Sequence, residues 1–170
     1  MAGRVWSSIQ LKVLVIAAAF VMAATALPAW ASLGGDAASV QADQIQLQGR
    51  RTMKTSGSYT VHEIQGPTGT VVREYVSGGK VFGVAWQGPW MPDMRQLLGS
   101  YFDQFARANQ ARADQAQANQ AQKGARIRRG PVLIDEPGLV VQIGGHPRAF
   151  AGRAYVPEML PAGVLPESVQ

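Results

Sequence analysis

The alternation of hydrophobic and polar positions is clearest between residues 58 and 86, where it predicts three strands. These segments are rich in β-branched and aromatic side chains, and short glycine-containing stretches separate them. Short strands joined in this way are typical of an antiparallel β-meander. In the third segment the larger side chains are those of Phe82, Val84 and Trp86, so we expect this set to face the core. The predicted strands are 58–65, 70–76 and 81–86.

A helical pattern follows the third strand. Apolar side chains recur at steps of three and four residues from Met94 to Phe105, which predicts one long amphipathic helix. Pro92 suits the first turn of this helix, and Asp93 suits the positive end of its dipole. A hairpin alone is marginal, but three strands and a covering helix enclose a core, so we expect the helix to lie across one face of the sheet.

Residues 106–123 carry a five-residue repeat of alanine and glutamine. Five residues advance a helix by about 500°, so each repeat lies about 140° around the helix from the previous one. The alanines therefore spiral and build no packing face, which indicates an exposed helical extension or a loose linker. We expect residues 108–124 to be dispensable for folding, and the family resemblance given below implies that 106–123 is a variable insertion.

The remaining segments complete an α+β domain. Short apolar runs predict additional C-terminal strands at 132–134, 139–143 and 148–156. Before the meander, Asp36 is placed to cap a short helix, and a basic connector follows. The predicted fold class is α+β, with a three-stranded antiparallel β-meander packed on one long amphipathic helix and additional C-terminal strands.

Residues 1–31 have the pattern of a secretory signal peptide. Two cations precede an apolar run at 13–26, and Ala31 ends an Ala-Trp-Ala cleavage motif before Ser32. The alternative is a membrane anchor, but a spanning helix needs about 20 apolar residues and this run is shorter. We expect cleavage between Ala31 and Ser32, a single domain at 32–170, a periplasmic or secreted location, and no later membrane span.

Charge and cysteine content narrow the function. The formal net charge is +5, and two of the cations lie in the leader, so the processed domain is only mildly basic and lacks the footprint of a nucleic-acid-binding protein. There is no cysteine, which excludes disulfides, cysteine nucleophiles, thiolate metal sites and lipoprotein anchoring. The basic segment at 123–129 is a solvated linker, a contact for anionic lipid or polysaccharide, or a protease target.

Two segments resemble a known family. The stretch VHEIQGPTGTVVREYVSGGKVFGVAWQGPWMPDMRQLLGSYF and the later GGHPRAFAGRAYVPEMLPAGV are similar to an uncharacterised family of exported proteobacterial proteins, filed as a domain of unknown function (DUF2844). The resemblance covers nearly all of the chain after the leader. It implies export and one intact domain, and it assigns no catalytic or binding residue.

The residues that could carry chemistry are few. His62 lies inside a predicted strand, where a hydrogen-bonded or solvated ring is the simpler interpretation, whereas His146 lies in a loop. No histidine or carboxylate spacing indicates a metal site, and no G-x-S-x-G motif indicates a serine hydrolase. We therefore predict no metal, no cofactor and no catalytic residue. The alternative enzyme is a small envelope hydrolase that uses His146 as its base.

A binding role needs only a rigid aromatic surface and complementary charge. Trp90, flanked by Pro89 and Pro92, is either a cap on the core or an exposed anchor, and Arg148 and Arg153 supply cations. We predict a non-catalytic binding or accessory module, with Trp90, His146, Arg148 and Arg153 as binding residues. Its partner is expected to be another envelope protein or an anionic envelope component. A structural or assembly accessory protein remains a further alternative.

Overall fold

The structure, a computed structural model, describes residues 33–123 and 130–170. The predicted leader with its cleavage site at Ala31 and Ser32, and the basic segment beyond Lys123, lie outside the described residues. In the described part of the chain, no helix is long and apolar enough to cross a membrane.

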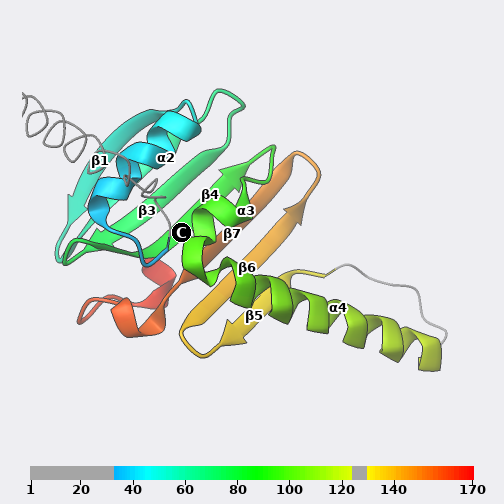
Figure 1. Ribbon diagram of the computed structural model, residues 1–170. Coiled ribbons are helices and arrows are strands. Elements are labelled where there is room, and N and C mark those ends of the chain that lie inside the picture. The colour runs from blue at the N-terminus through cyan, green and yellow to red at the C-terminus, as the bar shows by residue number, and fades with distance from the viewer. Residues whose placement is uncertain (1–32, 124–129) are drawn as a thin grey trace, which may run out of the picture.

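A seven-stranded antiparallel sheet forms the centre of the molecule (Figure 1). Its order is β1-β2-β3-β4-β7-β6-β5, so two meanders meet where β4 pairs with β7. Each strand pairs with its neighbour in the chain except at this junction, and β1 and β5 are the two edges. The strands are β1 (Arg50–Ser56), β2 (Tyr59–Gln65), β3 (Val71–Ser77), β4 (Lys80–Gly88), β5 (Val132–Glu136), β6 (Leu139–His146) and β7 (Ala149–Tyr155).

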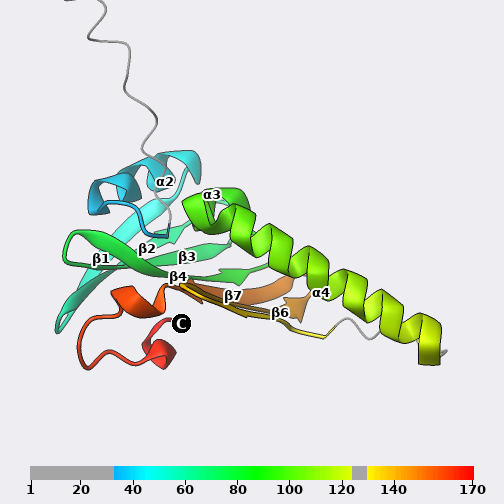
Figure 2. The ribbon, with the colours of Figure 1, turned by 60° about the horizontal axis from the view of Figure 1, so that its bottom comes forward.

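The two faces of the sheet have different covers (Figure 2). On the first, the helix face, lie α2 (Val40–Gln46), α3 (Met94–Leu98) and α4 (Phe102–Lys123), with short 3₁₀ turns η1 (Ala37–Ser39) and η2 (Gly99–Tyr101). On the second, the tail face, the cover provided by the described residues is the C-terminal segment, residues 157–170, with the 3₁₀ turns η3 (Pro157–Met159) and η4 (Pro166–Ser168).

Each face has its own hydrophobic core. The helix-face core includes Leu33, Ile64, Trp86, Leu97 and Leu98, all 2% exposed or less. The tail-face core is smaller: Val169 from the C-terminal segment packs with Tyr75, Phe82, Ala85, Val140 and Tyr155. Burial of apolar side chains on both faces ties the segments that cover them to the sheet.

The α+β class is confirmed, but the meander has four strands before the helix and not three. Arg50–Ser56, interpreted from the sequence as a connector, is the edge strand β1, and it pairs with β2 along its whole length. Six of its seven residues are exposed, so it carries no hydrophobic alternation by which a strand is detected. Cations are common on edge strands because they discourage pairing with other chains.

Strand β4 is buried on both faces, which makes the prediction of a single core-facing set wrong. Val84 and Trp86 belong to the helix-face core, whereas Phe82 belongs to the tail-face core. A register shift explains why Phe82 leaves the predicted set: Val76 pairs with Val81 and Tyr75 pairs with Gly83, so Phe82 is the extra residue of a β-bulge.

The predicted long helix is broken in two. The carboxylate of Asp93, which is the N-cap of α3, accepts the backbone N–H groups of Arg95 at 2.8 Å and Gln96 at 3.3 Å. Helix α3 ends at Gly99, whose φ of 50° suits glycine, and α4 begins at Phe102. The break allows both helices to pack apolar side chains against the same sheet. The apolar spacing from Met94 to Phe105 continues across the break, so it did not indicate two helices.

The alanine–glutamine repeat is helical to the end of α4. Its first turns touch the sheet, because Ala108 packs against the helix-face core and α4 contacts β5. From Ala111 onward nearly every described side chain is exposed. Of the two alternatives for this repeat, the structure therefore has the exposed helical extension.

Candidate functional site

The C-terminal segment is fastened to the tail face by polar groups of the sheet. The Arg153 Nη1–H donates to the carbonyls of Pro166 at 3.0 Å and Val169 at 3.3 Å. The Tyr75 hydroxyl donates to the Gln170 carbonyl at 2.5 Å and accepts the Gln170 N–H at 3.0 Å. These hydrogen bonds hold the C-terminal segment in place across the sheet. They therefore determine which part of the tail face the segment covers and which part stays exposed.

Three hollows of about 520, 460 and 400 Å³ surround the uncovered part of the tail face. All three include Gln87, near the end of β4, in their lining. We call the three together the trough. The first hollow extends over β7, β6 and β5 past Ala151, Gly144 and Leu133, the second extends over β3, β2 and β1, and the third lies beside the β6–β7 turn.

The charged side chains that line the trough have one sign. Four cations line it: Arg153 in the first hollow, Lys54 and Arg73 in the second, and Arg148 in the third. None of the described residues that line these hollows is an aspartate or a glutamate. The Arg73 Nε lies 2.7 Å from Glu63 Oε2, which partly neutralises this one cation from outside the lining. The trough is therefore suited to hold an anion.

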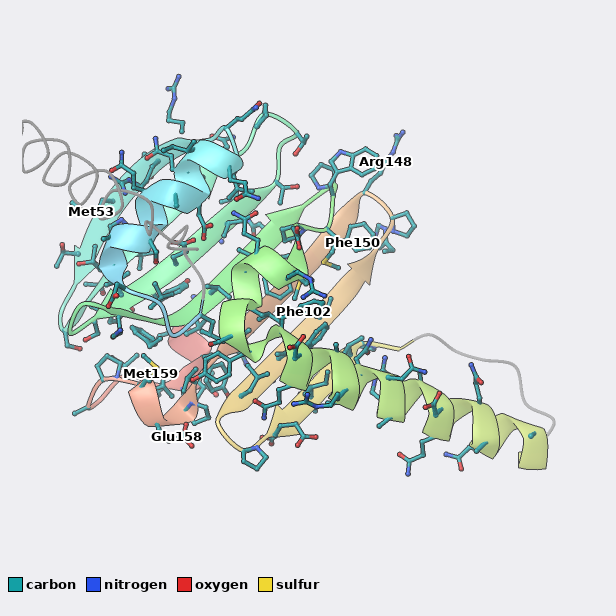
Figure 3. All side chains as sticks on the ribbon, in the orientation of Figure 1. Met53, Phe102, Arg148, Phe150, Glu158 and Met159 are labelled. Atoms are coloured by element: carbon teal, nitrogen blue, oxygen red, sulfur yellow. The ribbon has the colours of Figure 1, made fainter. Side chains whose placement is uncertain are left out.

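Two of the four predicted binding residues, Arg148 and Arg153, line the trough. Figure 3 places Arg148 at the tip of the β6–β7 turn, at the opposite end of the sheet from Glu158. Arg148 has a φ of 70°, an uncommon value for a residue other than glycine. Pro147 and Arg148 form this turn, so the expectation that His146 lies in a loop is wrong: His146 is the last residue of β6.

The other two predicted residues lie outside the lining. Trp90 is 61% exposed in the loop after β4, and its carbonyl accepts the Thr70 hydroxyl at 3.0 Å. Pro89, next to Trp90 in the chain, lines the same hollow as Arg148, so the backbone of Trp90 adjoins the trough. The His146 ring is exposed, and its one hydrogen bond within the described residues joins Nδ1 and the Pro147 carbonyl at 3.1 Å.

A second polar cluster is buried on the helix face. Asp43 from α2 and Glu74 from β3 are each 1% exposed, and the Gln96 side chain from α3 donates to Asp43 Oδ1 at 2.6 Å. Burial, followed by the hydrogen bond and charge of Asp43, raises the pKa of Glu74 to about 9. Burial also raises the pKa of Asp43. The Glu74 carboxyl group therefore keeps its proton near neutral pH.

His62 lies beside this cluster, opposite Glu74 in the pairing of β2 with β3. Burial and the positive charge of Arg51 lower the pKa of His62, which favours the neutral ring. Sequence reasoning missed the cluster, since Asp43 and Gln96 stand on short helices among other polar residues. A signal was present in Glu74, a carboxylate between Val72 and Val76 on the otherwise apolar side of its strand.

Metal chemistry has no assembled ligand set in the part of the chain that the structure describes. No group of three or more histidines, aspartates or glutamates is placed to hold an ion there. The buried cluster lines none of the hollows described above, so it is a structural element between α2, α3 and β3. The trough is the candidate functional site.

Comparison with known proteins identifies the family. The family model described as "Protein of unknown function (DUF2844)" matches residues 29–169, and the chain belongs to this family. The match covers every helix and strand of the fold and confirms the family resemblance noted in the sequence. No curated protein and no solved structure matches the chain.

Proposed function

We propose that this member of the DUF2844 family is an exported binding protein that holds an anionic component of the cell envelope in the trough. The observation that carries the proposal is the lining of the trough, with four cationic side chains and no aspartate or glutamate side chain among the described residues. A concave site with convergent groups of one charge attracts ligands of the opposite charge.

Binding without catalysis fits the groups in the lining better than hydrolysis does. General acid–base catalysis needs a proton-transferring group within hydrogen-bond reach of the substrate. The described lining offers hydroxyl, amide and cationic groups, and His146 is not among them. Cations and amides are groups that hold a ligand in place.

Export is the second part of the proposal, and the pattern of residues 1–31 supports it. If the full chain is produced in a bacterial host, intact-mass analysis of the periplasmic fraction should find a species that begins at Ser32. A full-length species held in the inner membrane would contradict export and cleavage.

The binding proposal is tested with two anionic probes of different architecture. Polygalacturonate represents acidic polysaccharides and dodecanoate represents anionic amphiphiles, with neutral dextran as the negative probe. Isothermal titration calorimetry of the protein from Ser32 onward should detect binding of at least one anionic probe and no binding of dextran. Reversal of two exposed trough charges, Lys54→Glu with Arg148→Glu, should weaken that binding about tenfold, or 1.4 kcal/mol.

A matched control separates the trough from overall charge. Arg107→Glu with Arg112→Glu makes the same change in net charge on the exposed side of α4, outside the trough, and should leave the affinity unchanged. Trp90→Ala with Arg148→Ala should weaken binding without unfolding, and His146→Ala should not affect it. Equal loss in the two charge-reversal variants, or loss confined to His146→Ala, would contradict the proposal.

A further inference from the structure

The first hollow has the most apolar lining of the three hollows of the trough. Pro131, Leu133, Gly144 and Ala151 line it with aliphatic atoms, and Leu133 is 59% exposed there. A Cβ placed on Gly144 would meet no atom within 4 Å, so the space above this part of β6 is empty. Exposed aliphatic surface that lines a hollow of about 520 Å³ favours an apolar ligand part.

The guanidinium of Arg153 lines the same hollow and is held in place by hydrogen bonds. The Arg153 Nε–H donates to Gln142 Oε1 at 2.8 Å, and Nη1 donates to the two carbonyls of the C-terminal segment. These acceptors are neutral, and within the described residues no carboxylate lies within 4.0 Å of the guanidinium. The contacts orient the charge without cancelling it, which prepares Arg153 to pair with an anion from outside.

We propose that the first hollow binds a single-chain anionic amphiphile, with its head group on Arg153 and its acyl chain along the wall of Pro131, Leu133, Gly144 and Ala151. This inference rests on the proposed function and names the ligand class. The shared chemistry is one aliphatic chain that ends in an anion, either the carboxylate of a fatty acid or the phosphate of a lipid head group. An acidic polysaccharide has the charge but nothing to cover the aliphatic wall.

Four small probes test the two halves of the ligand separately, each below its micellar range. Dodecanoate and dodecyl phosphate carry both the chain and the anion, dodecyl maltoside carries the chain with a neutral head, and butyrate carries the anion with a short chain. We expect dodecanoate to bind about a hundredfold more tightly than butyrate, because apolar burial grows with chain length. Dodecyl maltoside should bind at least about tenfold more weakly than dodecanoate.

Gly144→Leu is the variant that fills the apolar wall. The position is open and its backbone does not have a positive φ, so the fold accommodates a side chain there. We expect dodecanoate affinity to fall about tenfold in Gly144→Leu and to remain unchanged in Thr55→Leu, which adds the same side chain to an exposed position of β1. Arg153→Gln should weaken dodecanoate and leave dodecyl maltoside unchanged, and thermal unfolding checks that the C-terminal segment still holds.

The outcomes distinguish this inference from the proposed function. Tighter binding of either dodecanoate or dodecyl phosphate supports the inference and identifies the source of the anion. Equal affinity for dodecanoate and dodecyl maltoside, or equal loss in Gly144→Leu and Thr55→Leu, overturns it. If polygalacturonate binds and neither dodecanoate nor dodecyl phosphate binds, the ligand class is wrong and the proposed function stands. If no anionic probe binds, both are overturned.

Discussion

The helix face and the tail face of one sheet are covered in opposite ways. Three helices close the helix face over a continuous core, and the one polar cluster inside it is a pair of carboxyl groups with Gln96. One C-terminal segment covers part of the tail face and leaves the trough, in whose described lining every charged side chain is cationic. The helix face therefore contributes most of the buried apolar contacts, whereas the tail face leaves part of the sheet exposed.

The largest expected effect concerns the acid pair on the closed face. The pKa of Glu74 is about 9 in the folded chain and 4.5 in its ordinary state, so the folded chain holds a proton that the unfolded chain releases. Its contribution is therefore fully present below pH 4.5 and is lost as the pH rises through about 9. We expect a loss of unfolding free energy on the order of 5 kcal/mol across this range.

Glu74→Gln should remove this pH dependence, because the amide keeps the shape of the carboxyl group and carries no titrating proton. Urea unfolding at pH 5, 7 and 8.5 measures the slope, and the variant should be more stable than the parent protein at pH 8.5. Glu158→Gln, at an exposed position on the other side of the sheet, is the control and should keep the slope of the parent protein. Identical slopes in the parent protein and Glu74→Gln would contradict the raised pKa of Glu74.

The next effect compares one leucine from each face. Leu98, the last residue of α3, is fully buried, so Leu98→Ala should lower the free energy of unfolding by about 2–5 kcal/mol through lost burial and the cavity left behind. Leu133 lies exposed on the tail face, and Leu133→Ala should change it by less than about 0.5 kcal/mol. Chemical denaturation of both variants gives the two values, and comparable losses would mean that the tail face is as closed as the helix face.

A pair of glycines on neighbouring strands gives a smaller and sharper test. A Cβ at Gly152 would lie 2.3 Å from Trp86 Cζ2, because the indole lies against this strand, whereas a Cβ at Gly144 meets open space. Gly152→Ala should therefore destabilise the fold by about 1–3 kcal/mol, and Gly144→Ala should leave stability unchanged or raise it by up to about 1 kcal/mol. Melting temperatures that fall equally in both variants would show that the two faces are packed alike.

The smallest effect is expected at the far end of α4. Residues beyond Arg112 contribute almost no buried side chain in the described part of the helix, so replacing 113–123 with a Gly/Ser linker should lower the melting temperature by no more than about 2 °C. The replaced range is shorter than the 108–124 expected from the sequence, because Ala108 packs against the helix-face core. A drop as large as that of Leu98→Ala would show that the repeat stabilises the domain.

The sequence revealed the elements whose pattern is local. Strands β2, β3 and β4, the stripe of α3 and α4, and the three C-terminal strands were predicted because alternation or helical spacing is visible within each segment. Strand β1 was missed because an exposed edge strand has no apolar side to mark it. The two-sided burial of β4 was missed because it depends on Val169 and the C-terminal segment, far away in the chain.

The candidate site divides in the same way. Arg148 and Arg153 were predicted from their type and loop or strand context, and both line the trough. Lys54 and Arg73 were not, because only the register of β1, β2 and β3 brings their side chains to the same face. The pairing of Asp43 with Glu74 was equally invisible, since it joins a helix to a strand across a long separation in sequence.

The long separation in sequence between Tyr75 and the segment that covers it has a consequence for folding during synthesis. Gln170 bonds to Tyr75 across 95 positions, and Val169 closes the core that Phe82 enters. A ribosome that adds about 5–20 residues per second leaves Phe82 waiting for roughly 4 to 17 s before Val169 is made. Through that interval the growing chain presents an aromatic surface to its surroundings, so its passage to the folded state depends on shielding by chaperones or on delayed folding.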